Sequence, residues 1–287
     1  MSYAVKVENL HKSYGSNEIL KGISFSVSHG EIFAVLGING AGKTTTLECI
    51  EGLRKFESGT IKVNGSYGVQ LQSSSIPKDM QAIEALTLFA KWRRAPIDSE
   101  YVSKLGVEPF LKKRYSHLST GQKRRLHLAL ALIGDPDIIF LDEPTAGLDV
   151  EGRVSIHTQI MNLKARGKTI LLASHDMAEV EELCDKIIII KNGEIAFSGS
   201  AAELTETAQS IFELKVRFSK APDFSGAPSL SEFQSVKGYY QFTTDSLERT
   251  ISQIIGCCKA QNIVLIDIKV ERAGIERRFL EIAREEI

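Results

Sequence analysis

The chain has 287 residues, which is long enough for one large domain and a small one, or for two modest domains. Hydrophobic residues make up 43% and charged residues 25% of it, the ordinary mixture of a soluble globular protein. The formal net charge of −1 excludes a molecule whose overall charge attracts nucleic acid.

The first part of the chain is predicted to alternate strands with one short helix. Apolar residues either alternate with polar ones or run together in four expected strands, residues 3–7, 23–27, 31–36 and 58–64. A helix is expected over residues 43–51, because Gly52 ends its apolar pattern. From about residue 77 to 133 the pattern is helical, with Gly and Pro at the breaks.

Three continuous apolar runs follow, at residues 138–141, 169–173 and 186–190. Runs of this kind suit strands that are buried on both faces of a parallel sheet. Helical stretches at residues 154–165 and 177–183 separate the runs. This alternation predicts an α/β sandwich with a helical insertion. The apolar runs are all far shorter than the roughly 20 residues of a membrane-spanning helix, so any spanning part has to come from another chain.

After about residue 205 the pattern changes to that of a small α+β domain. Strands are expected at residues 212–218, 239–244 and 263–270, a helix at 246–260 and a loop at 221–231. The last stretch, residues 275–287, places Ile275, Phe279, Ile282 and Ala283 on one helical face. We expect that face to pack on the chain's own sheet rather than on a membrane.

The most specific motif runs from Gly37 to Thr44 and fits the pattern G-x-x-x-x-G-K-[ST] between a predicted strand and a predicted helix. Its glycines let backbone N–H groups turn inward around phosphates, and the helix N-terminus adds partial positive charge. Lys43 is expected to reach the β- and γ-phosphates, and the Thr44 hydroxyl to bind magnesium. The chain is therefore predicted to bind ATP with Mg²⁺.

Two further segments carry chemistry. An apolar strand ends in Asp142 and Glu143, which places the first carboxylate in the magnesium shell and the second where it can act as general base on the attacking water. Residues 118–122, Leu-Ser-Thr-Gly-Gln, precede a predicted helix. The Ser119 hydroxyl and the Gly121 backbone N–H at that helix start make a second anion site.

Together these motifs resemble those of the nucleotide-binding subunit of ATP-binding cassette (ABC) transporters, over residues 1–205. The resemblance implies an α/β fold, a P-loop NTPase core with an antiparallel β subdomain and a helical signature subdomain at about residues 76–135. Residues 206–287 then form a C-terminal accessory α+β domain. The resemblance also implies that ATP is sandwiched between two chains, with Ser119 and Gly121 contacting the γ-phosphate in trans. Thr120 stands where the family's commonest signature has Gly, and it adds a side chain near the nucleotide.

The same resemblance assigns the remaining site residues. Tyr14 matches the aromatic residue that stacks on adenine, Asp149 the residue that contacts the partner's phosphate loop, and His175 the switch histidine that senses the γ-phosphate. Gln72 matches the glutamine that approaches magnesium and couples the site to the permease; Gln70 is its rival, and strand phase favours Gln72. The expected nucleotide contacts are Tyr14, Gly37, Ile38, Asn39, Gly40, Ala41, Gly42, Lys43, Thr44, Thr45, Gln72, Ser119, Thr120, Gly121, Gln122 and Asp149. The expected catalytic residues are Glu143 and His175, and the expected metal ligands are Thr44, Gln72 and Asp142.

One segment departs from the family pattern. Members usually have a longer stretch between the turn at residues 64–65 and the strand before Gln72, and here only residues 66–68 intervene. This shortens the edge of the antiparallel subdomain. Hydrolysis is expected to survive, because no nucleotide-contacting motif lies in the missing stretch.

The function that this resemblance implies is an ATPase subunit that drives transport, in the direction of export, through a separate membrane permease. Two ATPs would close a homodimer and hydrolysis would reopen it, at the cytoplasmic face of the cell membrane. The residues beyond 205 resemble accessory segments of bacterial exporter-type ATPases of the drug and antibiotic-resistance kind. The four cysteines, which have no metal-ligand spacing, are expected to be free in a reducing cytoplasm.

Two alternatives stay open at this point. The first is a non-transport ABC ATPase acting in translation or DNA repair. Translation types generally carry two cassettes in one chain, whereas this chain has one. Repair types need a long coiled coil between the phosphate loop and the signature, whereas only 73 residues separate Thr44 from Leu118 here. The second is a nucleotide sensor without turnover, against which the intact Glu143 and His175 argue. Nucleic acid is not an expected partner, because the basic clusters at residues 112–114 and 123–125 lack interleaved aromatics and are expected to be solvated helix faces.

Overall fold

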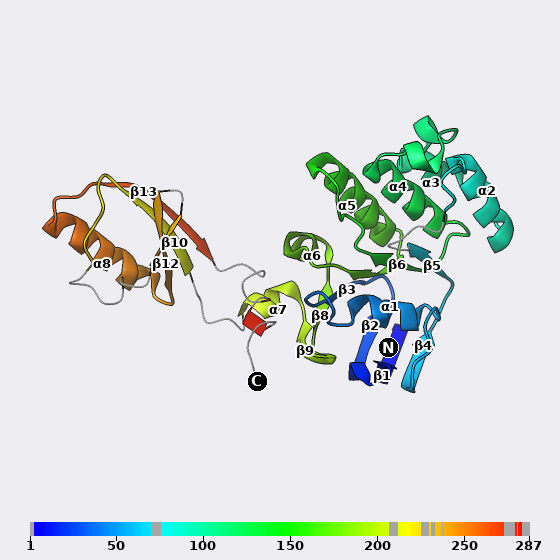
Figure 1. Ribbon diagram of the computed structural model, residues 1–287, viewed down its shortest axis with the longest axis horizontal. Coiled ribbons are helices and arrows are strands. Elements are labelled where there is room, and N and C mark those ends of the chain that lie inside the picture. Colours follow the sequence, from blue (N-terminus) through cyan, green and yellow to red (C-terminus); the bar gives the residue numbers. More distant parts are fainter. Residues whose placement is uncertain are drawn as a thin grey trace. The chain divides into compact units, whose positions relative to one another are not determined.

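The protein is described by a computed structural model that covers residues 3–70, 76–206, 212–224, 230, 233–236, 238–272, 279 and 281–282. The chain divides into two compact units, Met1–Ala201 and Ala202–Ile287 (Figure 1). The domain boundary expected at residues 205–206 stays a prediction. Gln72 lies outside the described residues, as does most of the predicted helix at 275–287.

A six-stranded sheet forms the centre of the first unit, in the order β5-β6-β7-β3-β8-β9. Its strands are β3 (Ile32–Leu36), β5 (Tyr67–Gln70), β6 (Ile138–Asp142), β7 (Thr169–Ala173), β8 (Lys186–Lys191) and β9 (Glu194–Gly199). All neighbouring pairs are parallel except β8 and β9. Every residue of β3, β6 and β7 is buried, as their apolar runs predict, so the α/β class inferred from the sequence is confirmed.

An antiparallel sheet and one helix cover one face of this centre (Figure 1). The sheet has the order β2-β1-β4, with β1 (Tyr3–Tyr14), β2 (Asn17–Ser28) and β4 (Ser58–Val63). Helix α1 (Lys43–Ile50) contributes Leu47 and Ile50 to the same hydrophobic core as Leu20 and Phe140. Strands β1 and β2 are much longer than predicted, because register shifts between Val7 and Leu10 let the pairing continue where the alternation breaks.

The shortened connection between β4 and β5 is fastened directly to the start of β6. The Ser66 backbone N and hydroxyl both donate to Oδ2 of Asp137, at 2.9 and 2.8 Å. The Ser66 carbonyl in turn accepts from the backbone N–H groups of Asp137 and Ile138, each at 3.0 Å. The chain therefore passes from one sheet to the other with no extra strand, and β4 is one edge of the antiparallel sheet.

Helices cover the opposite face, where Figure 1 places α4 and α5. They are α2 (Ala82–Arg93), α3 (Ser99–Lys104), α4 (Thr120–Ala131), α5 (Val150–Ala165) and α6 (Met177–Leu183), with short turns η1 (Glu108–Phe110) and η2 (Tyr115–His117). Helix α4 crosses β5 so closely that a Cβ on Gly68 would lie 1.9 Å from the Ala131 carbonyl oxygen. No helix in the described part of the chain is long and apolar enough to cross a membrane.

The two basic clusters differ from expectation in one respect. Residues 123–125 do lie in α4, but residues 112–114 form an exposed turn between η1 and η2 and not a helix face. Gly106 and Pro109 interrupt the helical pattern before this turn, and the structure has two single turns of helix, η1 and η2, where a continuous helical pattern is expected.

The second unit is a small antiparallel sheet with one helix packed on it. The sheet order is β11-β12-β10-β13, with β10 (Phe212–Phe218), β11 (Phe233–Val236), β12 (Tyr239–Thr244) and β13 (Leu265–Arg272). Helix α8 (Leu247–Ala260) buries Ile254 and Cys258 against Leu214 and Phe242. The short elements β9, β11 and α7 (Ala201–Glu206) are not among the expected ones, because six residues or fewer carry too little periodic pattern. All four cysteines are free.

Candidate active site

The loop between β3 and α1 has the shape of a phosphate cradle because glycines stand where side chains do not fit. A Cβ on Gly37 would lie 2.6 Å from the Ile190 carbonyl oxygen, and a Cβ on Gly42 would lie 2.7 Å from Leu20 Cδ2. Gly42 also has a φ of +107°, a conformation that side chains oppose. At the tip, Ile38, Asn39 and Gly40 are exposed, while Ala41 and Gly42 are buried.

Lys43 is held inside this loop. Its ammonium donates to the carbonyls of Gly37, at 2.8 Å, and Ile38, at 3.3 Å, and the side chain is buried. Burial lowers the pKa of Lys43, and the nearby carboxylates of Glu143 and Asp142 oppose that shift. The loop therefore encloses a buried positive charge, as a polyphosphate site requires.

Thr44 and Asp142 meet at the end of β6. The Thr44 hydroxyl donates to Oδ2 of Asp142 at 3.2 Å, whereas Oδ1 of Asp142 is buried and has no hydrogen-bond partner. Burial raises the pKa of Asp142, against the opposing hydrogen bond from Thr44. An unsatisfied buried carboxylate oxygen next to a hydroxyl fits a small hard cation, which takes oxygen ligands.

No group of three or more His, Cys, Asp or Glu in the described residues could hold a metal ion unaided. Mg²⁺ is usually bound by one or two protein ligands together with substrate oxygens and water. Thr44 and Asp142 are thus compatible with the predicted Mg²⁺.

Glu143 and His175 lie side by side at the carboxyl ends of β6 and β7. The His175 Nδ1 atom is 2.8 Å from Glu143 Oε1 and 2.7 Å from Oε2. The Glu143 side chain is only 11% exposed and that of His175 is 62% exposed. The backbone N–H of Glu143 donates to the Ala173 carbonyl at 2.9 Å, so the paired strands bring the two side chains together. Glu143 has a φ of +50°, a strained conformation for a non-glycine residue.

Tyr14 and Thr45 complete the expected nucleotide contacts around the loop. Tyr14 ends β1, its side chain is exposed, and the Lys12 ammonium lies 4.9 Å from its ring centre. The ring is thus held by a cation–π contact while it stays accessible. Thr45 is half-buried in the first turn of α1.

The sequence around Ser119 is a capping box. The Ser119 hydroxyl accepts from the backbone N–H of Gln122 at 3.2 Å, and the Gln122 side chain accepts from the Ser119 N–H at 3.1 Å. Thr120 places its methyl group 3.6 Å from the position of a Cβ on Gly147, so it packs against the turn before α5. The Ser119 hydroxyl proton is left available to donate to an external anion.

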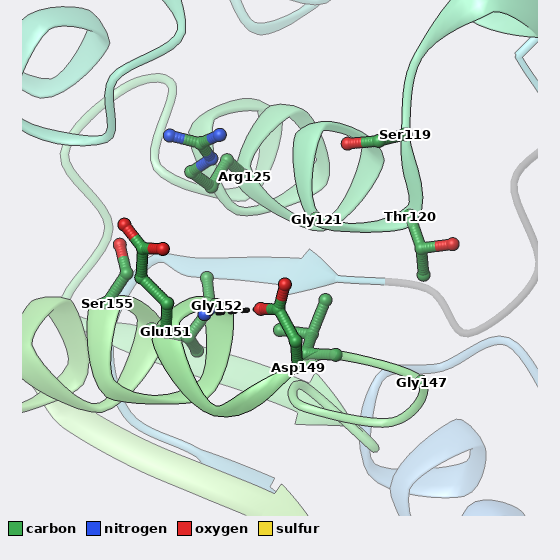
Figure 2. A pocket seen from close by; sticks show the side chains of 11 residues that line it. Ser119, Thr120, Gly121, Arg125, Gly147, Asp149, Glu151, Gly152 and Ser155 are labelled. Atoms are coloured by element: carbon green, nitrogen blue, oxygen red, sulfur yellow. Dashed lines mark hydrogen bonds between the residues drawn. The ribbon is translucent and has the colours of Figure 1, made fainter.

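A pocket of about 470 Å³ opens between the N-termini of α4 and α5 (Figure 2). Four predicted residues line it, Ser119, Thr120, Gly121 and Asp149, together with Arg125, Gly147, Leu148, Glu151, Gly152, Ser155 and Ile156. Asp149 caps α5, and its carboxylate accepts from the Gly152 N–H at 2.8 Å. The lining residues come from α4 with its N-cap Ser119, from α5 and from the turn before α5. No residue of the phosphate loop lines this pocket.

Gln70, the rival of Gln72, ends β5 and is 2% exposed, and neither its amide nitrogen nor its amide oxygen has a partner. Gln70 shares a strand face with Gly68, which is pressed against α4. Asp142 shares a strand face with Phe140, which packs in the core on the α1 side. Gln70 therefore lies on the wrong face of the sheet for a magnesium ligand. Gln72 lies outside the described residues and stays a prediction.

One buried carboxylate near Glu143 and His175 could not be expected from the sequence. Glu179 is 1% exposed and accepts hydrogen bonds from Ser174 and Thr145. In the sequence it occupies the third position of a helix that begins after Asp176, where an acidic residue is usually a helix-capping group. Nothing in the sequence around Glu179 signals that its carboxylate is buried and bonded to two hydroxyls.

Two family models match parts of the chain. A family model described as ABC transporter matches residues 20–146, and a second, described as AAA domain, putative AbiEii toxin, Type IV TA system, matches residues 112–181. The linearmycin resistance ATP-binding protein LnrL of Bacillus subtilis is 31% identical in an alignment of 306 positions that covers 97% of each chain. The Nod factor export ATP-binding protein I of Paraburkholderia xenovorans is 37% identical over 222 residues, 70% of this chain and 72% of the relative.

Solved structures give the same result for the fold. An ATP-binding subunit of an ABC transporter superposes with a TM-score of 0.64 at 27% identity, over 71% of this chain and 92% of that one. The subunit cbiO1 of the ABC transporter complex cbiONQ of Clostridium perfringens does so with a TM-score of 0.64 at 29% identity, over 72% and 92%.

Proposed function

Because this chain belongs to the ATP-binding proteins of ABC transporters, we propose that it powers the export of a substrate through a separate membrane permease. The chain is an ATPase of that family, in which the nucleotide-binding domain hydrolyses ATP. The relatives named above act in linearmycin resistance and in Nod factor export. The alignment with the first of them runs along nearly the whole chain, second unit included, which favours export over import.

The observation that carries the proposal is that two side-chain contacts, Thr44 with Asp142 and His175 with Glu143, lie at adjacent residues at the end of β6. Asp142 with Thr44 forms an oxygen-lined cation position, and the next residue, Glu143, is paired with His175. Mg²⁺ held by Thr44 and Asp142 would neutralise charge on the phosphates. Lys43 would exchange its carbonyl acceptors for phosphate oxygens, and Glu143 would take a proton from the attacking water.

The pocket at the signature supports a site that two chains share. Ser119 and Asp149 face a space between two helix N-termini, which attracts anions and acceptor groups. In the proposed cycle this face receives the nucleotide that a second copy of the chain holds in its own phosphate loop. ATP closes the pair because it binds the closed state more tightly, and hydrolysis removes that difference.

A permease needs a surface on which to dock, and α2 offers one. Trp92 is 72% exposed and Leu88 52% exposed on this helix, and Phe89 contacts the Trp92 ring edge-on with 6.0 Å between the ring centres. Exposed apolar side chains that cluster on one element mark interaction surfaces more often than isolated ones do. Through such a contact the chain would be held at the cytoplasmic face of the cell membrane.

The test is co-purification from native membranes. The tagged chain is expected to be recovered with one integral membrane protein, and Trp92→Glu together with Leu88→Glu is expected to abolish that recovery while ATP hydrolysis is retained. Leu53→Glu, at another exposed leucine after α1, serves as the matched control. Consistent recovery with ribosomes or DNA in place of a membrane protein would replace this proposal by the alternative of a non-transport ATPase.

A further inference from the structure

The carboxylate of Glu179 is hydrogen-bonded to both of the segments that carry the catalytic side chains of Glu143 and His175. Oε2 of Glu179 accepts a hydrogen bond of 2.6 Å from the hydroxyl of Ser174, the residue immediately before His175. Oε1 accepts a hydrogen bond of 3.0 Å from the hydroxyl of Thr145, two residues after Glu143. The segments after β6 and after β7 therefore share one anchor.

This anchor is almost completely removed from water. Glu179 and Ser174 are each 1% exposed and Thr145 is 5% exposed. Burial raises the pKa of Glu179, while the hydrogen bonds from Ser174 and Thr145 act in the opposite direction. In such surroundings hydrogen bonds are strong and costly to break, so the three groups hold a defined geometry.

The local backbone needs such an anchor. Glu143 has a φ of +50°, and strained residues keep their conformation only where neighbouring contacts determine it. One such contact is the Glu143 N–H to the Ala173 carbonyl; Thr145 supplies another through its side chain. On the other strand the Ser174 hydroxyl, besides donating to Glu179, accepts from the Asp176 N–H at 3.1 Å, which fixes the turn that carries His175.

The surroundings of Glu179 add support from α5. The Nε2 atom of His157, itself 5% exposed, lies 3.5 Å from Glu179 Oε1, and its Nδ1 lies 2.9 Å from Glu182 Oε2. Asp176, at the start of the same helix as Glu179, pairs with Arg153 of α5 at 2.8 Å. These contacts hold α6 against α5. From α6, the Glu179 side chain extends to Thr145 after β6 and to Ser174 after β7.

We infer that Glu179 is a positioning residue that holds Glu143 and His175 in register with each other, through Thr145 and Ser174. Glu179 is 1% exposed, so it acts through these two neighbours and not by its own contact with the nucleotide or the attacking water. The inference rests on the proposed function, because the pair that it positions is the pair that hydrolyses ATP.

Loss of Glu179 should therefore affect kcat for ATP hydrolysis but not the Kd for ATP. Loss of the anchor shifts the catalytic side chains and lowers kcat, whereas the phosphate loop, which binds ATP, keeps its own contacts and the Kd for ATP is unchanged. A displacement of catalytic groups by a fraction of an ångström to 1 Å costs up to about 100-fold in rate. We therefore expect Glu179→Leu to lower kcat by roughly 10- to 100-fold. Glu179→Gln is expected to lose less, because an amide can still accept from one hydroxyl and donate to the other.

Three further variants complete the test. Thr145→Val and Ser174→Ala each delete one hydroxyl while the carboxylate stays, and each is expected to lower kcat without changing Kd; they keep the test decisive if Glu179→Leu does not fold. Thr145→Val added to Glu179→Leu is expected to have no further effect, because both changes remove the same contact. Glu181→Gln, at an exposed residue of the same helix, is the matched control.

Steady-state ATPase rates give kcat for each variant, and titration with a fluorescent ATP analogue gives Kd. Unchanged kcat in a folded Glu179→Leu chain, or a rise in Kd in step with the loss of kcat, would overturn the positioning role. The proposed function fails separately, if the unaltered chain does not hydrolyse ATP or if Glu143→Gln hydrolyses it at the same rate.

Discussion

The Nδ1 atom of His175 lies within 2.8 Å of one carboxylate oxygen of Glu143 and within 2.7 Å of the other. The glutamate is nearly buried and its backbone is paired to β7, while the histidine is largely exposed. A water molecule that reaches Glu143 must therefore share the carboxylate with His175. In the proposed mechanism the two residues act as one unit, in which Glu143 accepts a proton from the attacking water and the exposed His175 contacts the phosphate.

Replacing Glu143 by Gln tests this unit. The amide cannot accept the proton of the attacking water, and we expect ATP hydrolysis to fall by roughly 100- to 10,000-fold while ATP binding is retained. Since the closed pair of subunits can no longer release itself by hydrolysis, the variant should elute as a dimer from a sizing column in ATP and as a monomer in ADP. A variant that stays monomeric in saturating ATP would speak against the shared site.

Replacing Lys43 by Ala tests the phosphate loop. The buried ammonium is expected to make charge-assisted hydrogen bonds to phosphate oxygens, each of about 1.5–3 kcal/mol, so its loss should weaken ATP binding by roughly 100-fold or more. Lys55→Ala, at an exposed lysine just beyond α1, is the control for a general change of charge. Isothermal titration calorimetry gives both affinities, and equal values would refute the assignment of the loop.

Mixing two inactive variants tests whether the signature acts in trans. Lys43→Ala disables the phosphate loop and Ser119→Arg fills the signature pocket with a bulky cation, so each variant alone should be inactive. In a mixed dimer one site combines the intact loop of one chain with the intact signature of the other. Hydrolysis should therefore reappear on mixing. If no mixing ratio restores activity, the two motifs do not meet between chains.

Glu51 predicts a pH dependence of stability. It is buried at the end of α1, and burial, with a smaller contribution from the charges of Asp142 and Glu48, raises its pKa to about 8. The folded chain thus keeps a proton that the unfolded chain loses above its ordinary value of 4.5. Stability is accordingly lost as the pH rises from about 4.5 to about 8 and is constant above that.

Glu51→Gln should remove this loss. Near pH 4.5 the variant and the unaltered chain should unfold at similar temperatures, and at pH 8.5 the variant should be more stable by on the order of 2–4 kcal/mol. Thermal unfolding monitored by circular dichroism, without nucleotide or metal, measures the difference at each pH. Glu108→Gln, at an exposed glutamate, should shift neither end of the profile. A constant difference between variant and unaltered chain across the range would contradict the assignment.

The sequence predicted those features that depend on local patterns. The buried strands β3, β6 and β7 are continuous apolar runs, and the loop from Gly37 to Thr44 carries its glycines at fixed spacing. The pairing of Glu143 with His175 could be expected only by resemblance, since it depends on the neighbouring positions of β6 and β7 in the sheet.

Features that depend on tertiary packing could not be predicted from patterns. Glu179 has the sequence position of a helix cap, and only the approach of Thr145 and Ser174 gives it a second role. The attachment of Ser66 to Asp137 joins residues that no local rule relates. Strands β9 and β11 have six and four residues, too few for a clear periodic pattern, so their pairing with β8 and β12 defines them.

The contacts of Lys43 with Gly37 and Ile38 bear on the kinetics of nucleotide capture. A loop that is already folded around its own lysine needs no ordering when ATP arrives, because one set of oxygen acceptors simply replaces another. Association should then approach the rate at which ATP diffuses to the loop, and differences in affinity between ATP and ADP should appear in their dissociation rates. The lifetime of the bound nucleotide, and not the speed of its arrival, would time each turn of the cycle.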